Sequence, residues 1–163
     1  MSDNPFILYF DGACEWWNGK RNPGGLATYG WYIELDGQRI AWGYGEAARG
    51  NGATNNVAEY MGLISAIKAA SDLGLVPDFI IRGDSQLVIR QMAGTYSVNS
   101  PLLLPLWSQA KTLLSEMDAY CSFEWVPREE NEQADELSKR AYQLSKSKQG
   151  IWSERFKVNG GPK

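Results

Sequence analysis

The stretch TNNVAEYMGLISAIKAA, residues 54–70, predicts a helix, and one charged residue in it stands out. At 3.6 residues per turn, Glu59 shares a side of this helix with Gly62, Leu63 and Ala66, which are apolar. A solvated acid near the positive end of the helix dipole is one interpretation. A carboxylate kept for chemistry is the other, and the rest of the chain has to decide between them.

The residues before this helix predict three strands. Phe6–Phe10 is an apolar run rich in aromatic and branched residues, which favours a buried strand that ends at Asp11. Residues 26–47 read as two strands joined at Asp36 and Gly37, a pair typical of a type I′ hairpin turn. Three consecutive strands with short connections predict an antiparallel meander.

The residues after the helix alternate between short apolar strands and helices. Strands are expected at 79–84 and 121–127, and helices at 85–94, from about 101 to 117, and from Asn131 or a neighbour onward. Strands separated by helices join a sheet in parallel through right-handed crossovers. The expected fold is therefore α/β, with one mixed five-stranded sheet and helices on both faces.

The chain divides into a domain and a basic end. Residues 1–146 are expected to form one domain, and residues 147–163 a polar, glycine-ended, mobile tail. Although the net charge of the 163 residues is −3, the segment from Lys139 to the end carries seven Lys or Arg and one Glu.

Composition excludes several classes of site. With no histidine and two cysteines, the chain has no Ser-His-Asp or Cys-His site and no His-ligated zinc. No apolar run approaches membrane-spanning length, and the first residues lack the pattern of a signal peptide. These features predict a protein without membrane segments or disulfides, located in the cytoplasm.

Four acids follow the predicted strands in a suggestive pattern. Asp11 and Asp84 come directly after apolar strands, Glu59 lies near the start of the first helix, and Asp135 lies near the start of the last. Ligands of open α/β sheets collect at the carboxyl ends of parallel strands, so the four carboxylates are expected to converge. Carboxylates brought together repel one another, and a pair of divalent ions removes the repulsion. Their oxygens suit Mg²⁺, with Mn²⁺ as the alternative.

Four motifs carry a resemblance to a known family. FDGAC (10–14), TNNVAEYMGL (54–63), GDSQLVI (83–89) and NEQADELS (131–138) resemble, in order and spacing, type 1 ribonuclease H, over roughly residues 5–145. The resemblance implies the ribonuclease H-like fold. It also implies an endonuclease that hydrolyses the RNA strand of RNA–DNA hybrids with two metal ions and leaves 5′-phosphate and 3′-hydroxyl ends.

The resemblance also implies a role for each carboxylate. Asp11 corresponds to the aspartate that bridges both ions, and Asp135 to the ligand of the ion that activates the attacking water. Glu59 and Asp84 correspond to ligands of the ion that faces the leaving group. Taken singly, Asp11 is equally a turn residue, Asp84 a helix cap and Asp135 a solvated acid; together the four favour the metal site.

Substrate contacts are implied in the same way. Asn55, Asn56 and Gln86 correspond to residues that read the minor groove of the hybrid, where the 2′-OH distinguishes RNA from DNA. The remaining implied contacts are a further groove residue, a contact to a DNA phosphate, a residue beside the substrate and a residue at the start of the last helix: Asn22, Thr54, Cys14 and Asn131.

Three departures from the family pattern affect the expected site. The loop 127–131 has no histidine, as in the archaeal-type branch, and Arg128 is the candidate for the histidine's catalytic role; a surface arginine paired with a neighbouring glutamate is the alternative. Residues 93–105 have no Lys or Arg where relatives carry a basic protrusion, so the basic tail is expected to help hold the hybrid. Trp16 and Trp17 either stack on nucleic acid or pack over the sheet edge or the C-terminal tail.

The sequence leaves other functions to be separated by experiment. A catalytically inactive hybrid-binding module, a transposase or integrase core and a magnesium-dependent metabolic enzyme are alternatives. The expected partner is an RNA–DNA hybrid bound by a monomer, with double-stranded RNA as a second possible substrate. Cleavage of a hybrid, compared with duplex DNA and duplex RNA, separates these readings.

Overall fold

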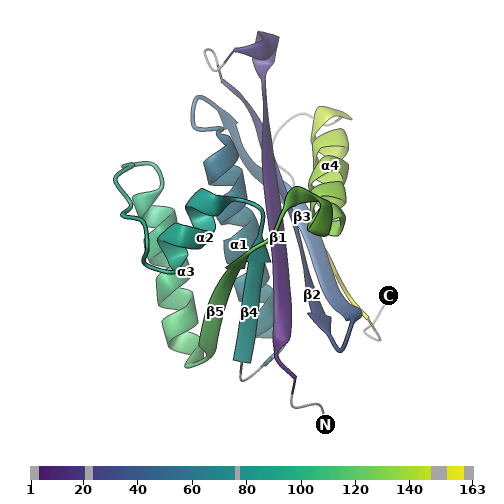
Figure 1. The fold of residues 1–163 in the computed structure, drawn as a ribbon. Helices are drawn as coiled ribbons and strands as arrows, with labels where there is room; N and C mark the ends of the chain where they lie inside the picture. The colour runs from purple at the N-terminus through teal and green to yellow at the C-terminus, as the bar shows by residue number, and fades with distance from the viewer. Residues whose placement is uncertain (1–3, 21–23, 76–77, 148–153, 160–163) are drawn as a thin grey trace.

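The computed structural model describes residues 4–20, 24–75, 78–147 and 154–159, and it shows a sheet with helices on both faces (Figure 1). The elements, in chain order, are β1 (Phe6–Trp16), β2 (Gly25–Leu35), β3 (Gln38–Gly50), α1 (Asn55–Asp72), β4 (Asp78–Gly83), α2 (Gln86–Met92), α3 (Leu104–Met117), β5 (Tyr120–Trp125), α4 (Glu132–Ser147) and β6 (Arg155–Val158). Two short 3₁₀ turns lie at 17–19 and 128–130.

The sheet has the predicted mixed topology. Its strand order is β5-β4-β1-β2-β3-β6, with β1 to β3 antiparallel and with β4 and β5 added in parallel beside β1. Asp36 and Gly37 have positive φ of 53° and 78°, which is the backbone that a type I′ turn requires. The α/β class and the hairpin are therefore confirmed.

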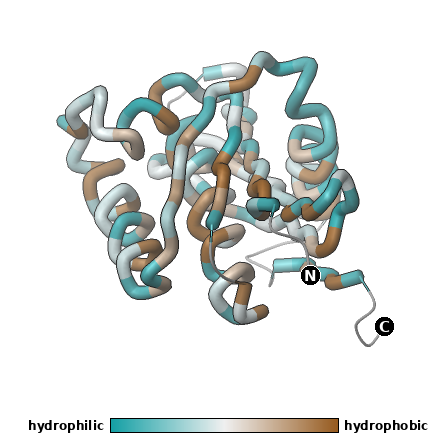
Figure 2. The backbone as a smooth tube through the Cα atoms, turned by 60° about the horizontal axis from the view of Figure 1, so that its bottom comes forward, coloured by the Kyte–Doolittle hydropathy of each residue, from teal (hydrophilic) through white to brown (hydrophobic). Residues whose placement is uncertain are grey.

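Helix α1 covers one face of the sheet. It begins at Asn55 because the Thr54 hydroxyl accepts a hydrogen bond from Val57 N at 3.1 Å, and it stops before Gly74, whose φ is +68°. Its apolar side packs on β1 and β2 and forms the main core, with side chains such as Phe10 and Trp31 fully buried. In Figure 2 hydrophobic and hydrophilic residues alternate along the helices, as this packing requires.

Helix α4 covers the opposite face. It crosses β2 at Gly30, where an added Cβ would lie 2.5 Å from Leu137 Cβ, so only glycine allows this close approach. A smaller core lies beneath it, in which the rings of Tyr9 and Tyr32 stack at 4.5 Å and pack with Ala134. Helices on both faces were predicted, and this arrangement confirms them.

The sheet has six strands, so the expectation of five was wrong. The sixth, β6, comes from the segment predicted to be mobile, and it pairs with Ala41–Tyr44 of β3. Glu154, directly before β6, accepts hydrogen bonds from Tyr29 Oη at 2.6 Å and Trp31 Nε1 at 3.2 Å. These contacts fix residues 154–159 to the sheet.

Candidate active site

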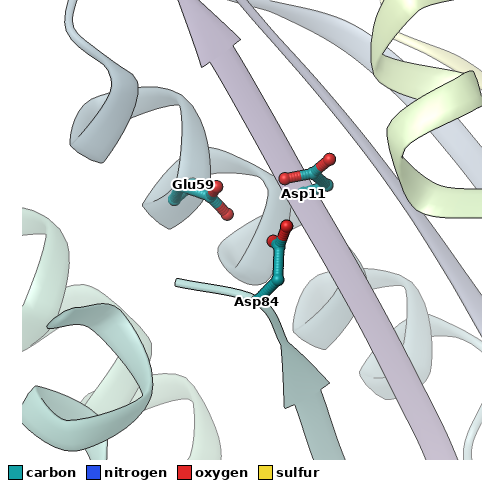
Figure 3. A group of neighbouring side chains, drawn as sticks. All are labelled: Asp11, Glu59 and Asp84. Carbon is teal, nitrogen blue, oxygen red and sulfur yellow. The ribbon is translucent and has the colours of Figure 1, made fainter. Parts of the chain in front are cut away.

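Three of the four predicted carboxylates lie together where β1 and β4 diverge. One carboxylate oxygen each from Asp11, Glu59 and Asp84 lies within 4.8 Å of the other two (Figure 3). Asp11 was expected at the end of its strand, but β1 continues to Trp16, paired only with β2, whereas its pairing with β4 stops at Tyr9. The site thus lies at the carboxyl end of the parallel part of the sheet, as predicted.

Burial and neighbouring charges raise the pKa of two carboxylates of this group, Asp11 and Glu59. Burial, followed by the charge of Asp84, raises the pKa of Asp11 from 3.8 to about 8. Burial, followed by the charge of Asp11, holds the pKa of Glu59 well above its ordinary value. Without a cation, the cluster therefore retains protons at neutral pH, and a bound cation would favour the fully ionised form.

The cluster has the polar atoms that a hard cation needs. Glu59 Oε2 is buried and has no hydrogen-bond partner among the described residues, which is costly unless a ligand satisfies it. Asp11 Oδ1 accepts a bond from Gly12 N at 2.9 Å, which fixes one side of that carboxylate. Carboxylate oxygens of this kind are the ligands that Mg²⁺ and Mn²⁺ prefer, so the residues fit a divalent ion.

Asp135 lies near the cluster but outside the group of three. It is in the first turn of α4 and forms a 3.0 Å ion pair with Lys139. Its charge still contributes to the raised pKa of Asp11, so the two carboxylates interact. The fourth predicted carboxylate is thus within electrostatic reach of the site but is held by a lysine of its own helix.

Asn131 has an internal role that the sequence analysis did not predict. Its side chain is fully buried, and Nδ2 donates to Phe10 O at 2.9 Å and to Asp84 Oδ1 at 3.3 Å. Because its side chain has no exposed surface, Asn131 is placed to act within the protein, and its contact with a substrate stays a prediction. Asn131 joins the start of α4 to β1 and orients Asp84. Its place four residues before Asp135 was the available signal.

Two of the predicted groove residues, Asn55 and Asn56, line a pocket of about 510 Å³ at the start of α1, the helix that carries Glu59. The predicted phosphate contact Thr54 also lines it. Asn55 Oδ1 accepts a bond from Cys14 N at 2.8 Å, which fixes its amide relative to β1. Trp16 and residues of the segment 97–103 line the pocket too, and the sequence did not predict this contribution from 97–103. The described residues that line the pocket are all uncharged.

The other predicted residues are less closely connected to the cluster. Gln86 is exposed at the start of α2, and Asn22 lies outside the described residues. Arg128 is exposed on the turn before α4 and forms no ion pair within the described part of the chain, so the alternative of a surface arginine paired with a neighbouring glutamate is not seen. Burial, followed by the charge of Glu15, raises the pKa of the Cys14 thiol, which disfavours a reactive thiolate.

No helix within the described ranges is both long enough and apolar enough to cross a bilayer. The two cysteines are free.

The sequence and the fold have counterparts in known proteins. A family model described as reverse transcriptase-like matches residues 10–141. Ribonuclease HI of Halobacterium salinarum is 42% identical over 134 residues, which is 82% of this chain and 62% of that protein. The bifunctional protein Rv2228c of Mycobacterium tuberculosis is 39% identical over 123 residues, which is 76% of this chain and 33% of that protein. The chain thus spans less than two thirds of either relative.

Two solved structures of ribonuclease H1 enzymes are also similar to this chain in sequence and fold. RNase H1 from Halobacterium salinarum NRC-1 superposes with a TM-score of 0.74 at 40% identity, covering 87% of this chain and all of that one. LC11-RNase H1, solved in complex with an RNA/DNA hybrid, superposes with a TM-score of 0.77 at 31% identity, covering 87% of this chain and 99% of that one.

Proposed function

The chain belongs to the ribonuclease H1 family, and we propose that it is an endonuclease that hydrolyses the RNA strand of RNA–DNA hybrids. The observation that carries this proposal is the group of Asp11, Glu59 and Asp84, in which one carboxylate oxygen from each residue lies within 4.8 Å of the other two. The hybrid bound by LC11-RNase H1 supports the choice of substrate.

The carboxylates would hold two divalent ions, most simply Mg²⁺, with Mn²⁺ as the alternative. Asp11 interacts with Glu59, Asp84 and Asp135, so it is the residue that we propose both ions would share. When bound, such ions lower the pKa of a coordinated water and stabilise the leaving oxygen. The expected products carry 5′-phosphate and 3′-hydroxyl ends.

Residues of the chain prepare the carboxylate site for the positive charge of the ions. Burial removes Asp11 and Glu59 from water and strengthens their interaction with a cation. Asn131 orients the Asp84 carboxylate through a 3.3 Å hydrogen bond to Oδ1. Lys139 forms an ion pair with Asp135 in the metal-free site. When the divalent ions bind, release of that ion pair would free the fourth carboxylate. We propose that exposed Arg128 assists product release through its positive charge.

The pocket at the start of α1 is the proposed seat of the substrate backbone and groove. Asn55 and Asn56 present amides, which donate and accept hydrogen bonds and so suit a 2′-OH and base edges in the minor groove. Thr54 and Ser100 add hydroxyls for a phosphate of the DNA strand. Gln86 is proposed as a further groove contact from α2. Cys14 positions Asn55 through its backbone N–H and lies beside the substrate.

A cleavage panel tests the proposal. Labelled hybrid, duplex DNA and duplex RNA are incubated with Mg²⁺ and with Mn²⁺, and the termini of the products are identified. Cleavage of the hybrid's RNA strand, abolished in Glu59→Gln and retained in Glu116→Gln, is the expected result; Glu116 is exposed on α3 and serves as the matched control. Binding without cleavage of the hybrid would instead identify a hybrid-binding module. Cleavage of duplex RNA would widen the substrate range.

A further inference from the structure

A second pocket, of about 490 Å³, lies on the far side of α4 from the carboxylates. It is formed by β3, β6 and α4, and the described residues that line it include three bases and no acid. The bases are Arg140 of α4 and Arg155 and Lys157 of β6, and all three side chains are exposed. No step of the proposed hydrolysis uses this pocket.

The β3–β6 pairing places bases directly beside aromatic rings. Trp42 lies opposite Lys157, and Tyr44 lies opposite Arg155. Residues opposite each other on antiparallel strands point to the same face of the sheet. Trp42 and Tyr44 pack against the smaller core beneath α4, so this face is the one that α4 covers. The pairing register of β3 and β6 therefore sets the spacing of the charged side chains in the pocket.

One arginine of the pocket, Arg140, is held in a way that suits phosphate. Its guanidinium lies over the Tyr44 ring, 5.5 Å from the ring centroid. Outside the pocket lining, Arg39 lies over the Trp42 ring at 4.7 Å and adds a further positive charge nearby. Stacking on a ring orders the flat guanidinium while its N–H donors remain free at the edge. A fork of donors fixed in this way binds phosphate oxygens in pairs.

The pocket and Asp11 lie in the same row of paired residues across the sheet. Asp11 pairs with Gly30, Gly30 with Tyr44, and Tyr44 with Arg155, so the four residues form one row across the sheet. Three strand spacings separate Asp11 from Arg155, which is about 14 Å. Helix α4 stands on this row between them, against Gly30 (Figure 1).

This arrangement favours a flexible polyanion over a stiff one. A duplex seated at the carboxylates cannot bend around a helix, because its persistence length is about 150 base pairs. A single strand can pass around α4. We propose that the pocket binds the backbone of single-stranded nucleic acid, in particular a single-stranded extension of a hybrid held at the carboxylates.

Direct binding tests this proposal without requiring hydrolysis. Anisotropy of a labelled oligothymidylate is measured in EDTA across a salt series, for the wild type and for Arg140→Ala/Arg155→Ala/Lys157→Ala. Each phosphate contact to a single strand contributes about 0.7 to the salt slope, so the triple variant should lose about 2 from the slope and bind roughly a hundredfold more weakly at 0.1 M salt. Lys157→Ala should weaken binding more than its matched control, Lys68→Ala, an exposed lysine on α1.

A second measurement separates a single strand from a duplex. The KM for a hybrid with a single-stranded extension should be lower than that for a blunt hybrid in the wild type, and equal to it in the triple variant, with kcat unchanged. The proposal would be overturned if the triple variant bound the oligothymidylate as tightly as the wild type does. It would also be overturned if the triple variant lost the same amount of affinity for the oligothymidylate and for the blunt hybrid. Because the anisotropy assay needs no cleavage, an inactive enzyme would refute the proposed function and leave this result intact. Unfolding curves verify that the variants are folded.

Discussion

Replacing Asp11 with asparagine should make the metal-free protein more stable at neutral pH. Burial and Asp84 raise the pKa of Asp11 from 3.8 to about 8. Between these values the folded protein keeps a proton that the unfolded chain has released, so stability falls as pH rises, and below 3.8 the effect vanishes. The value pH 7 lies about 3 units above 3.8, the ordinary pKa that applies in the unfolded chain. At about 1.4 kcal/mol per unit, the raised pKa of Asp11 lowers the free energy of unfolding at pH 7 by about 4 kcal/mol.

The substitution should remove most of that cost. Asparagine keeps an oxygen that accepts the bond from Gly12 N, and its amide can donate to Glu59 Oε2, which has no partner among the described residues. We expect a gain of about 2–4 kcal/mol in the free energy of unfolding at pH 7, because solvent entering the site screens part of the repulsion. The gain should shrink by about 1.4 kcal/mol per unit as pH is lowered toward 5.

Urea unfolding in EDTA, followed by tryptophan fluorescence at several pH values, measures the gain. Asp72→Asn, at the exposed end of α1, is the control and should show little pH dependence. A gain for Asp11→Asn that is the same at pH 5 and pH 7, or a loss at pH 7, would refute the reasoning. Added Mg²⁺ should then stabilise the wild type more than the variant, since a cation binds the folded site with its carboxylates ionised.

Further predictions concern the neighbouring residues. Glu59→Gln should lower kcat for hybrid cleavage by at least about a hundredfold while the metal-free protein stays as stable or becomes more stable, as steady-state kinetics and unfolding curves will show. Asn131→Ala should cost about 1–3 kcal/mol of stability, because its bonds to Phe10 O and Asp84 Oδ1 are buried, and it should lower kcat more than it raises KM. Asn56→Ala should weaken hybrid binding by roughly 0.5–1.5 kcal/mol with Mg²⁺ affinity unchanged; a loss of metal affinity would place Asn56 in the metal site instead.

Local signals predicted most of the fold. The Asp36–Gly37 turn, the glycine after α1 and the apolar runs of β1 and β4 each depend on neighbouring residues, so the sequence displays them directly. The strand β6 has four residues and no turn signal, and its pairing with β3 depends on contacts more than 100 residues away. Such contacts leave no periodicity in the sequence.

The site could be predicted in part for the same reason. Glu59 lies near the start of α1, Asp84 directly follows β4, and Asp11 follows the part of β1 that pairs with β4. The topology of the sheet brings these positions together. Burial depends on the packed structure, so the sequence did not distinguish internal Asn131 from its exposed neighbours. Nor did it show that Asp135 pairs with Lys139, because an i, i+4 acid and base on a helix surface is common and often unpaired.

The short strand β6 also bears on self-association. It is the last strand on its side of the described sheet, so it occupies the edge that β3 would otherwise present. An exposed edge of unpaired N–H and C=O groups is a template for pairing with another chain, and charged side chains on an edge strand discourage this. Arg155 and Lys157 are such charges. A chain truncated before residue 154 would expose the edge of β3 and should aggregate more readily than the full chain, as light scattering during storage would show.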